Sequence, residues 1–211
     1  MSRRMNRGPA VLALAAALAT WVGSARAQDL DVGSETARRA IHVCASCHGD
    51  GGRSKSPAYP SLAGQPAAYT AGQLMDFRAQ QRAEADSKAY MWGVSALLDD
   101  GSIQALAAYY EKQTPPAGRS KAPAALLRTG QKLFQEGSAS QGIRACAACH
   151  GDHAEGAAGF PRLAGQHADY LVSQLKIFST RLRPHGVLMK AETASMTPAQ
   201  MKAVAAYLQS L

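Results

Sequence analysis

Apolar side chains recur at helical spacing near the end of the chain. The stripe consists of Met201, Val204, Leu208 and Leu211. Residues three or four apart share one face of a helix, so this segment predicts an amphipathic helix. The segment 197–200 (TPAQ) precedes it in the pattern of a capping box with proline at the first helical position. A similar stripe, earlier in the chain, consists of Ile103, Leu106, Ala107 and Tyr110.

Two further segments, 67–81 and 168–181, are compatible with helices, and no segment alternates apolar and polar residues as a strand would. Glycine- and proline-rich stretches separate these segments. The pattern therefore predicts an all-α fold, with about three or four short helices in each half of the chain.

The chain is internally duplicated. Cys44–Asp50 (CASCHGD) recurs as Cys146–Asp152 (CAACHGD), and Tyr59–Gln65 (YPSLAGQ) recurs as Phe160–Gln166 (FPRLAGQ). Further positions match in the same order: Tyr69, Gln73, Phe77, Arg82 and Met91 correspond to Tyr170, Gln174, Phe178, Arg183 and Met189. A repeat of this kind predicts two similar domains. Residues 114–123 have the composition of a linker, which predicts domains at 28–117 and 118–211.

The first 27 residues have the pattern of a secretory signal peptide. Arg3, Arg4 and Arg7 precede an apolar run of 14 residues, Pro9–Val22, and Ala25–Ala27 supplies a small-x-small cleavage pattern. The alternative is a retained anchor helix, but the run is shorter than the ~20 residues needed to span a bilayer. We therefore expect cleavage after Ala27 and a soluble periplasmic protein.

Charge is unevenly distributed along the chain. The net charge of +8 includes four arginines in residues 1–27, so the nucleic-acid interpretation of a high isoelectric point is weak. Residues 28–114 carry a net −2 and residues 115–211 a net +6, which could orient the protein toward a partner. Aromatic residues make up only 6% of the chain, so something other than side chains is expected to fill part of the interior.

All four cysteines lie in Cys-x-x-Cys pairs, for which three interpretations compete. Each pair could form a disulfide or a thioredoxin-like redox site, or both pairs could share one zinc ion. In both pairs a histidine follows immediately, which is the attachment pattern of c-type haem. Two such motifs behind an export signal favour two covalent haem c groups. The attachment residues are then Cys44, Cys47, Cys146 and Cys149, with His48 and His150 as the proximal iron ligands.

Met91 and Met189 are the candidate distal ligands because they occupy equivalent places in the two halves. Thioether sulfur favours ferrous iron, so a histidine–methionine pair suits electron transfer. The alternative is that methionine simply fills the core. That alternative is favoured for Met75, Met196 and Met201, which lack this paired position.

Four other histidines and one basic cluster have simpler explanations. The histidines without a duplicate are His42, His153, His167 and His185, and we expect each to be a surface or loop residue. His185 could compete for the second iron because it precedes Met189 closely. The cluster Arg181, Arg183 and Lys190 is either a docking patch for an acidic partner or, more simply, a solvated helix end.

Taken together, the two CxxCHGD motifs, the two P-x-L-A-G-Q motifs and the paired methionines resemble the dihaem cytochrome c4 family over residues 36–211. The resemblance implies two tandem class I cytochrome c domains related by an approximate twofold axis. It also implies that the haem propionates approach each other across the interface. The carbonyls of Pro60 and Pro161 would accept a hydrogen bond from the proximal histidines. The chain departs from the family at Gln80 and Arg181, where a glycine is usual, and in a longer loop before Met91.

The resemblance implies soluble periplasmic electron transfer, commonly to a terminal haem-copper oxidase. The alternatives are a dihaem enzyme, such as a thiosulfate dehydrogenase or peroxidase, and a dedicated subunit that receives electrons from one dehydrogenase. We expect no nucleic acid and no small-molecule substrate. Because positive charge disfavours ferric iron, the net charges of the halves predict a lower potential for the first haem.

Overall fold

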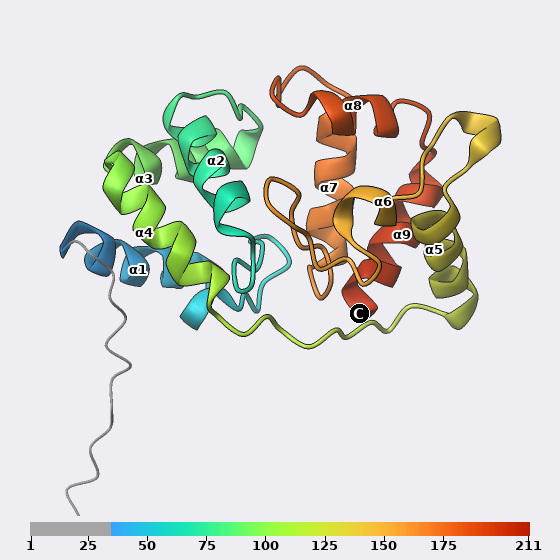
Figure 1. Ribbon diagram of the computed structural model, residues 1–211, viewed down its shortest axis with the longest axis horizontal. Coiled ribbons are helices and arrows are strands. Elements are labelled where there is room, and N and C mark those ends of the chain that lie inside the picture. The colour runs from blue at the N-terminus through green and yellow to red at the C-terminus, as the bar shows by residue number, and fades with distance from the viewer. Residues whose placement is uncertain (1–34) are drawn as a thin grey trace, which may run out of the picture. The chain divides into compact units, whose positions relative to one another are not determined.

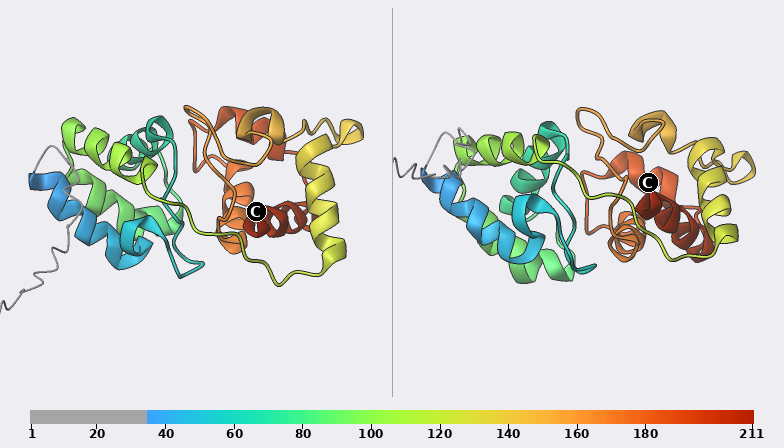
Figure 2. Two further views of the ribbon diagram at one scale, coloured as in Figure 1. Left: turned by 60° about the horizontal axis from the view of Figure 1, so that its bottom comes forward. Right: turned by 90° about the horizontal axis from the view of Figure 1, so that it is seen from below.

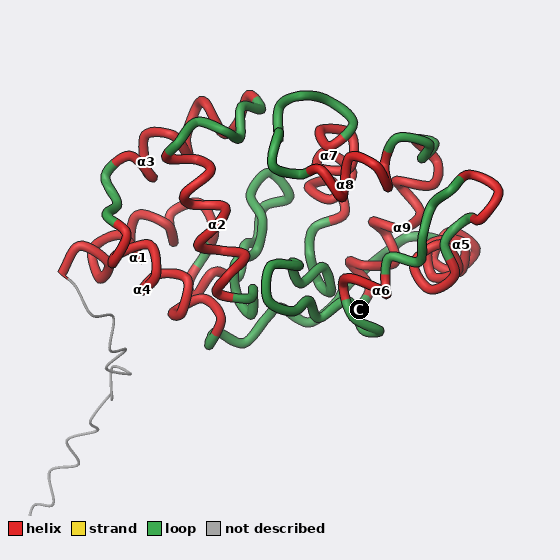
Figure 3. Tube along the Cα trace, turned by 45° about the horizontal axis from the view of Figure 1, so that its top comes forward, coloured by secondary structure: helices red, strands yellow, loops and turns green. Residues whose placement is uncertain are grey.

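The computed structural model describes residues 35–211, and residues 31–211 form one compact unit. The predicted signal peptide lies outside the described residues. Every regular element in residues 35–211 is a helix, and loops separate these helices (Figure 3). Within that range no helix has both the length and the apolar character needed to cross a membrane.

The first half packs four α-helices around one another (Figure 1). They are α1 (Glu35–His48), α2 (Ala67–Arg78), α3 (Trp92–Ala96) and α4 (Asp100–Glu111), with a 3₁₀ turn η1 (Asp50–Gly52) and a π-helical turn η2 (Ser87–Met91). α4 contacts both α1 and α2. Ile103 and Leu106 of α4 are buried, which is the outcome predicted from their spacing.

The second half repeats this plan with five α-helices. They are α5 (Ala124–Glu136), α6 (Ala147–His150), α7 (Ala168–Phe178), α8 (Val187–Thr193) and α9 (Pro198–Ser210), with a 3₁₀ turn η3 (Ala139–Gln141). α9 packs on α5 and α7. The predicted capping box is present, because the Thr197 hydroxyl accepts from the Gln200 backbone N–H and the Gln200 side chain accepts from the Thr197 N–H.

The approach to the second cysteine motif is interrupted, whereas α1 runs without a break into His48. α5 ends at Glu136, and Gly137 follows with a φ of 70°. A Cβ on Gly137 would lie 2.3 Å from the Ile143 oxygen. Only glycine suits both this conformation and this close approach. A short turn paired through Ser138 and Ile143 then leads to the motif.

The two halves are joined by a segment without helix, residues 112–123, which is clear in both views of Figure 2. Its two ends belong to different halves. Pro115 lies against Gly64, while the Arg119 N–H donates to the Gln209 oxygen of α9 at 2.8 Å. The contacts therefore change from the first half to the second between these residues, and a domain boundary after residue 117 stays our prediction.

The helices predicted over 67–81 and 168–181 both end three residues earlier than expected, at Arg78 and Phe178. After α2 the chain turns at Gln80, which has a φ of 57°. This left-handed conformation suits glycine, the residue usual there in the family. Arg181, the equivalent residue in the second half, is absent from the described residues with positive φ, so the two turns differ.

Candidate functional site

The first Cys-x-x-Cys-His motif lies at the end of α1. Cys44 and Cys47 are three residues apart and Cys44 and His48 four apart, so all three side chains lie toward one side of the helix. The helix stops because Gly49 adopts a φ of 76°, and its N–H donates to the Ala45 oxygen at 2.9 Å. The local fold thus presents two thiols and one imidazole together.

The second motif forms its own short helix. Cys146 caps α6, which ends at His150, and the Gly151 N–H donates to the Ala147 oxygen at 2.9 Å. Gly151 has a φ of 83°, close to that of Gly49. The same arrangement of side chains therefore arises twice, although different elements lead into it.

The thiols do not fit the two alternative uses of cysteine. All four are free, so neither pair is a disulfide. Burial raises the pKa of Cys44 and raises the pKa of Cys146 to about 11, whereas a thioredoxin-like nucleophile needs a lowered pKa. Within residues 35–211 no three metal-binding side chains of the His, Cys, Asp and Glu types gather, so the two pairs do not share a zinc ion.

Each proximal histidine is fixed by a proline carbonyl. His48 Nδ1 lies 2.8 Å from the Pro60 oxygen, and His150 Nδ1 lies 3.0 Å from the Pro161 oxygen. Because a carbonyl only accepts, each Nδ1 carries the hydrogen and each Nε2 keeps its lone pair. Burial lowers the pKa of both rings against the opposing effect of these carbonyls, which favours the neutral imidazole that binds iron.

One cavity of about 830 Å³ contains the predicted site residues of both halves. The predicted residues that line it are Cys44, Cys47, His48, Pro60, Met91, Cys146, Cys149, His150, Pro161 and Met189. The two motifs and both methionines therefore face one large internal space. Such a space, with thiols and neutral imidazoles in its wall, fits a large planar cofactor and accounts for the low aromatic content.

The methionines divide as their duplication predicts, with one addition. Met91 ends η2 and Met189 lies in α8, and both line the cavity. Met75 is absent from the lining. Met201 is buried, as expected of a core residue. Met196 packs against the core of the second half but also reaches the cavity wall, which its sequence position did not indicate.

The four unduplicated histidines are outside the ligand positions. His42 and His153 are exposed. His167 Nε2 lies 3.1 Å from the Ser54 oxygen of the first half. His185 lines the cavity, but its Nδ1 lies 2.7 Å from Asp76 Oδ1, so this ring is already paired with a carboxylate.

The repeated glutamine of the P-x-L-A-G-Q motif joins the two halves reciprocally. Gln65 donates to the Arg162 oxygen and accepts from the Arg162 N–H, at 2.7 and 3.0 Å. Gln166 makes the same two bonds with Ser61, both at 2.9 Å. Equivalent residues exchange equivalent bonds, as expected of an interface around an approximate twofold axis. The sequence did not predict that Gln65 and Gln166 join the two halves. The available signal was that both copies of the motif keep this polar residue.

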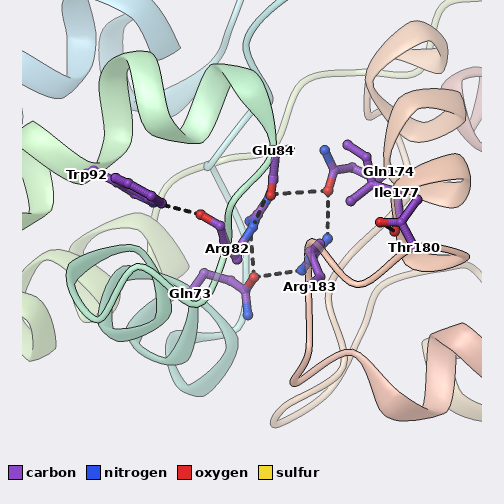
Figure 4. A network of polar contacts seen from close by, with 8 residues as sticks. All are labelled: Gln73, Arg82, Glu84, Trp92, Gln174, Ile177, Thr180 and Arg183. Carbon is purple, nitrogen blue, oxygen red and sulfur yellow. Dashed lines mark hydrogen bonds and ion pairs between the residues drawn. The ribbon is translucent and has the colours of Figure 1, made fainter.

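A second reciprocal contact involves two arginines and two glutamines, which we call the arginine–glutamine cluster (Figure 4). Gln73 Oε1 accepts from Arg82 Nη1 at 3.1 Å and from Arg183 Nη2 at 2.7 Å. Gln174 Oε1 accepts from the same two guanidinium groups, also at 3.1 and 2.7 Å. Two like charges are thus held together by amide oxygens.

The position of Arg183 corrects the sequence interpretation. We expected a solvated helix end or a docking patch, but only 8% of Arg183 is exposed. Its guanidinium lies 4.2 Å from the ring centre of Phe178, as that of Arg82 lies 4.3 Å from Phe77. Stacking and the two glutamines compensate for the lost water. Arg181 and Lys190 remain exposed, so the three residues form no single cluster.

The charge of this cluster fits an anionic cofactor. Arg82 and Arg183 both line the cavity. Within residues 35–211, Arg82 is paired with the carboxylate of Glu84, whereas the hydrogen bonds of Arg183 go to amide oxygens. An uncompensated buried charge is strongly unfavourable. The propionate carboxylates of haem would supply the missing negative charge. The thiols, the neutral imidazoles and the positive charge in the cavity wall therefore fit two haem groups.

Comparisons with known proteins agree with this geometry. The Cytochrome c family model matches residues 35–113 and 127–211. Cytochrome c-552 of Acidithiobacillus ferridurans is 41% identical, over 85% of this chain and 80% of its own. The solved structure of cytochrome c4 from Acidithiobacillus ferrooxidans has a TM-score of 0.72 and 40% identity, covering 80% of this chain and 98% of that one. The two matched segments confirm an all-α fold of two tandem cytochrome c domains.

A third relative carries a functional name. The thiosulfate dehydrogenase electron acceptor of Thiomonas intermedia is 39% identical, over 78% of this chain and 76% of its own length. Its name describes a protein that accepts electrons from one enzyme. Two kinds of electron-transfer protein are therefore similar to this chain.

Proposed function

Because the chain belongs to the dihaem cytochrome c4 family and is an electron-transfer cytochrome with two covalently bound haem c groups, we propose that it carries electrons from respiratory or dehydrogenase donors to a terminal acceptor such as a haem-copper cytochrome c oxidase. When bound, each haem c accepts or releases one electron at its iron. The observation that carries the proposal is the matched pair of sites, each with a histidine fixed by a proline carbonyl and a methionine in the same cavity wall.

The cysteines of each motif hold one haem through two thioether bonds. Cys44 and Cys47 bind the first haem, and Cys146 and Cys149 bind the second. Because the thiols of each pair lie three residues apart at a helix end, they reach one edge of the same porphyrin. Covalent attachment fixes the cofactor beside the adjacent histidine.

In this proposal His48 and Met91 would hold the iron of the first haem, and His150 and Met189 would hold that of the second. The carbonyls of Pro60 and Pro161 orient each imidazole by accepting the Nδ1 hydrogen, which directs Nε2 toward the metal. A thioether ligand in addition to the imidazole would raise the reduction potential. This ligand set leaves no position for a substrate, so we propose an electron carrier and not an enzyme.

The test combines mass and spectrum on the purified holoprotein. The mature chain should carry two haem groups, and the oxidised protein should show the weak sulfur-to-iron band near the red end of the spectrum. One haem, or four free thiols, would refute the attachment. Two haems without the sulfur band would refute the methionine ligands while leaving the attachment intact.

We also propose a domain boundary after residue 117, where the contacts of the linker change from the first half to the second.

We further propose export through residues 1–27 and a soluble periplasmic protein that starts at Gln28. This export proposal is supported by the arginine-rich start, the apolar run and the small-residue cleavage pattern. N-terminal sequencing of the protein from the periplasmic fraction tests the cleavage site. An intact N-terminus in the membrane fraction would replace this proposal with a retained anchor.

A second candidate is a dedicated acceptor for one thiosulfate-oxidising enzyme, favoured by the name of the Thiomonas relative. The two candidates differ in donor specificity. A dedicated acceptor would be reduced by a purified thiosulfate dehydrogenase with thiosulfate far faster than by other donors, whereas a general carrier would show no such preference. Thiosulfate oxidation by the protein alone, with an artificial electron acceptor, would instead indicate an enzyme.

A further inference from the structure

The arginine–glutamine cluster is symmetric in its cations but not in its anions. Arg82 and Arg183 are equivalent residues of the two halves and make equivalent bonds to Gln73 and Gln174. Only Arg82 is also paired with an acid, Glu84. Glu84 lines the cavity with Cys44, Cys47 and His48, so the first half contributes a buried carboxylate to the wall. Among the described residues the second half contributes none.

Glu84 is a buried, ionised carboxylate. It is 6% exposed, and its Oε1 accepts from Arg82 Nε at 3.1 Å and from Nη2 at 2.5 Å. Its Oε2 is buried with no hydrogen-bond partner. Burial alone would raise the pKa of Glu84, but the charge of Arg82 and the hydrogen bonds to the carboxylate together outweigh burial and lower it. The carboxylate is therefore negative at neutral pH.

The equivalent residue in the second half is His185. Its side chain is 63% exposed and pairs with Asp76, which lies in the first half. The described hydrogen bonds and ring contact of Arg183 are to Gln73, Gln174 and Phe178, all of them uncharged. Among the described residues, the buried cation of the first half is thus neutralised by a carboxylate, and that of the second half is not.

Glu84 also belongs to the segment that carries Met91. The Lys88 N–H donates to the backbone carbonyl oxygen of Glu84 at 3.1 Å, at the start of the helical turn η2 that ends in Met91. The Glu84 carboxylate is held by the two bonds from Arg82. Its negative charge is therefore fixed beside the ligand segment of the first half.

We propose that Glu84 is the residue that separates the two haem potentials, by lowering the potential of the haem on Cys44 and Cys47 relative to the other. The inference rests on the proposed two-haem electron carrier. A negative charge stabilises the extra positive charge of ferric iron. Because Glu84 is buried, dissolved salt screens it far less than it screens the surface charges of the two halves.

The test is a redox titration of the full holoprotein carrying Glu84→Gln, which keeps the shape and removes the charge. Wave assignment comes from Met91→His in each background, because that change moves only the first haem. We expect the reduction potential of the first haem to rise relative to that of the second. The equilibrium distribution of one electron between the two haems should change about threefold. At 59 mV per tenfold for one electron, this equals about 28 mV.

Two matched variants separate charge from position. Asp86→Asn removes an exposed carboxylate two residues further along the same segment. It should change the potential of either haem by only a small fraction of the shift expected for Glu84→Gln. Glu84→Asp keeps the charge and should keep the order and most of the separation of the waves. An equal shift in Asp86→Asn, or unchanged waves in Glu84→Gln, would overturn the inference.

If Glu84→Gln fails to fold with haem, Arg183→Gln tests the same asymmetry from the other side. Removing the unneutralised cation should lower the potential of the second haem and narrow the separation, and unchanged waves would again overturn the inference. Failure of the proposed carrier is distinguishable, because it would appear in the unmodified protein as a missing sulfur-to-iron band or a missing haem.

Discussion

In the first half a single helix, α1, leads directly into His48. In the second half α5 ends before Gly137, and a separate short helix, α6, contains His150. Both routes produce the same histidine–proline bond, at 2.8 and 3.0 Å. The surroundings differ more than the sites do, since Glu84 is buried where its counterpart His185 is exposed. The comparison teaches that the geometry of cofactor attachment was kept after duplication, while the buried charge beside it diverged.

The largest difference between the halves should follow from removing one cofactor. The double variant Cys44→Ala, Cys47→Ala lacks both thiols of the first motif, so the mature protein should carry one haem, attached to the second half. The mass of the purified chain checks this. The matched variant Cys146→Ala, Cys149→Ala should lose the second haem instead. A mass unchanged by either double substitution would contradict covalent attachment at these residues.

Changing one distal ligand should separate the two sites strongly. Met189→His replaces a thioether with an imidazole, which stabilises ferric iron better, so the second wave should fall by roughly 0.1–0.3 V within the ~0.8 V range that axial ligands span. A redox titration measures the shift. Met75→Leu is the control, because Met75 lies outside the cavity wall. Loss of a sulfur band in Met75→Leu would show that Met91 is the wrong ligand.

Two helical glycines should respond in opposite directions. Gly130 lies where α5 crosses α9, and a Cβ there would be 2.0 Å from the Ala203 oxygen. Gly130→Ala should therefore lower the free energy of unfolding of the holoprotein by about 2–3 kcal/mol. Gly72 in α2 has open space, so Gly72→Ala should raise it by about 0.5–1 kcal/mol. Denaturant titration checks both, and a Gly130→Ala protein of unchanged stability would contradict the observed helix crossing.

The two turns that replace the family glycine should also differ. Gln80 adopts a φ of 57°, so Gln80→Gly relieves a left-handed backbone and should raise the free energy of unfolding by about 1 kcal/mol. Arg181 is not among the described residues with positive φ, so Arg181→Gly should bring no gain. Thermal unfolding of the two variants measures this difference. Equal gains would mean that both turns carry the same strain.

The smallest effect concerns salt. Part of the separation between the two potentials should come from surface charge, net −2 against net +6, and this part should shrink as the Debye length falls from about 30 Å at 0.01 M to about 3 Å at 1 M. The part due to buried Glu84 should persist. Titrations at both ionic strengths check this in the unmodified protein and in Glu84→Gln, whose separation should nearly vanish at high salt. A salt-independent separation in Glu84→Gln would point to a different origin.

Short-range features of the chain could be predicted from its sequence. The Cys-x-x-Cys-His spacing fixes three side chains within little more than one helical turn, and the capping box at Thr197 and Gln200 is complete within four residues. The apolar stripe of α4 is buried as its period predicts. The internal repeat then predicts two similar sites, because equal local patterns fold into equal local structures.

Contacts between residues far apart in the sequence were decided only by the tertiary structure. Gln65 bonds to Arg162, and Gln174 receives bonds from both Arg82 and Arg183, yet nothing near these residues in the sequence indicates the partner. We expected Arg183 to be solvated, but in the structure it is buried, stacks on Phe178 and donates to Gln73 and Gln174. By itself the sequence determined the cofactors, the helices and the repeat. The fold decided which of the repeated polar residues would meet, and therefore where buried charge remains, because desolvation depends on neighbours that sequence distance does not specify.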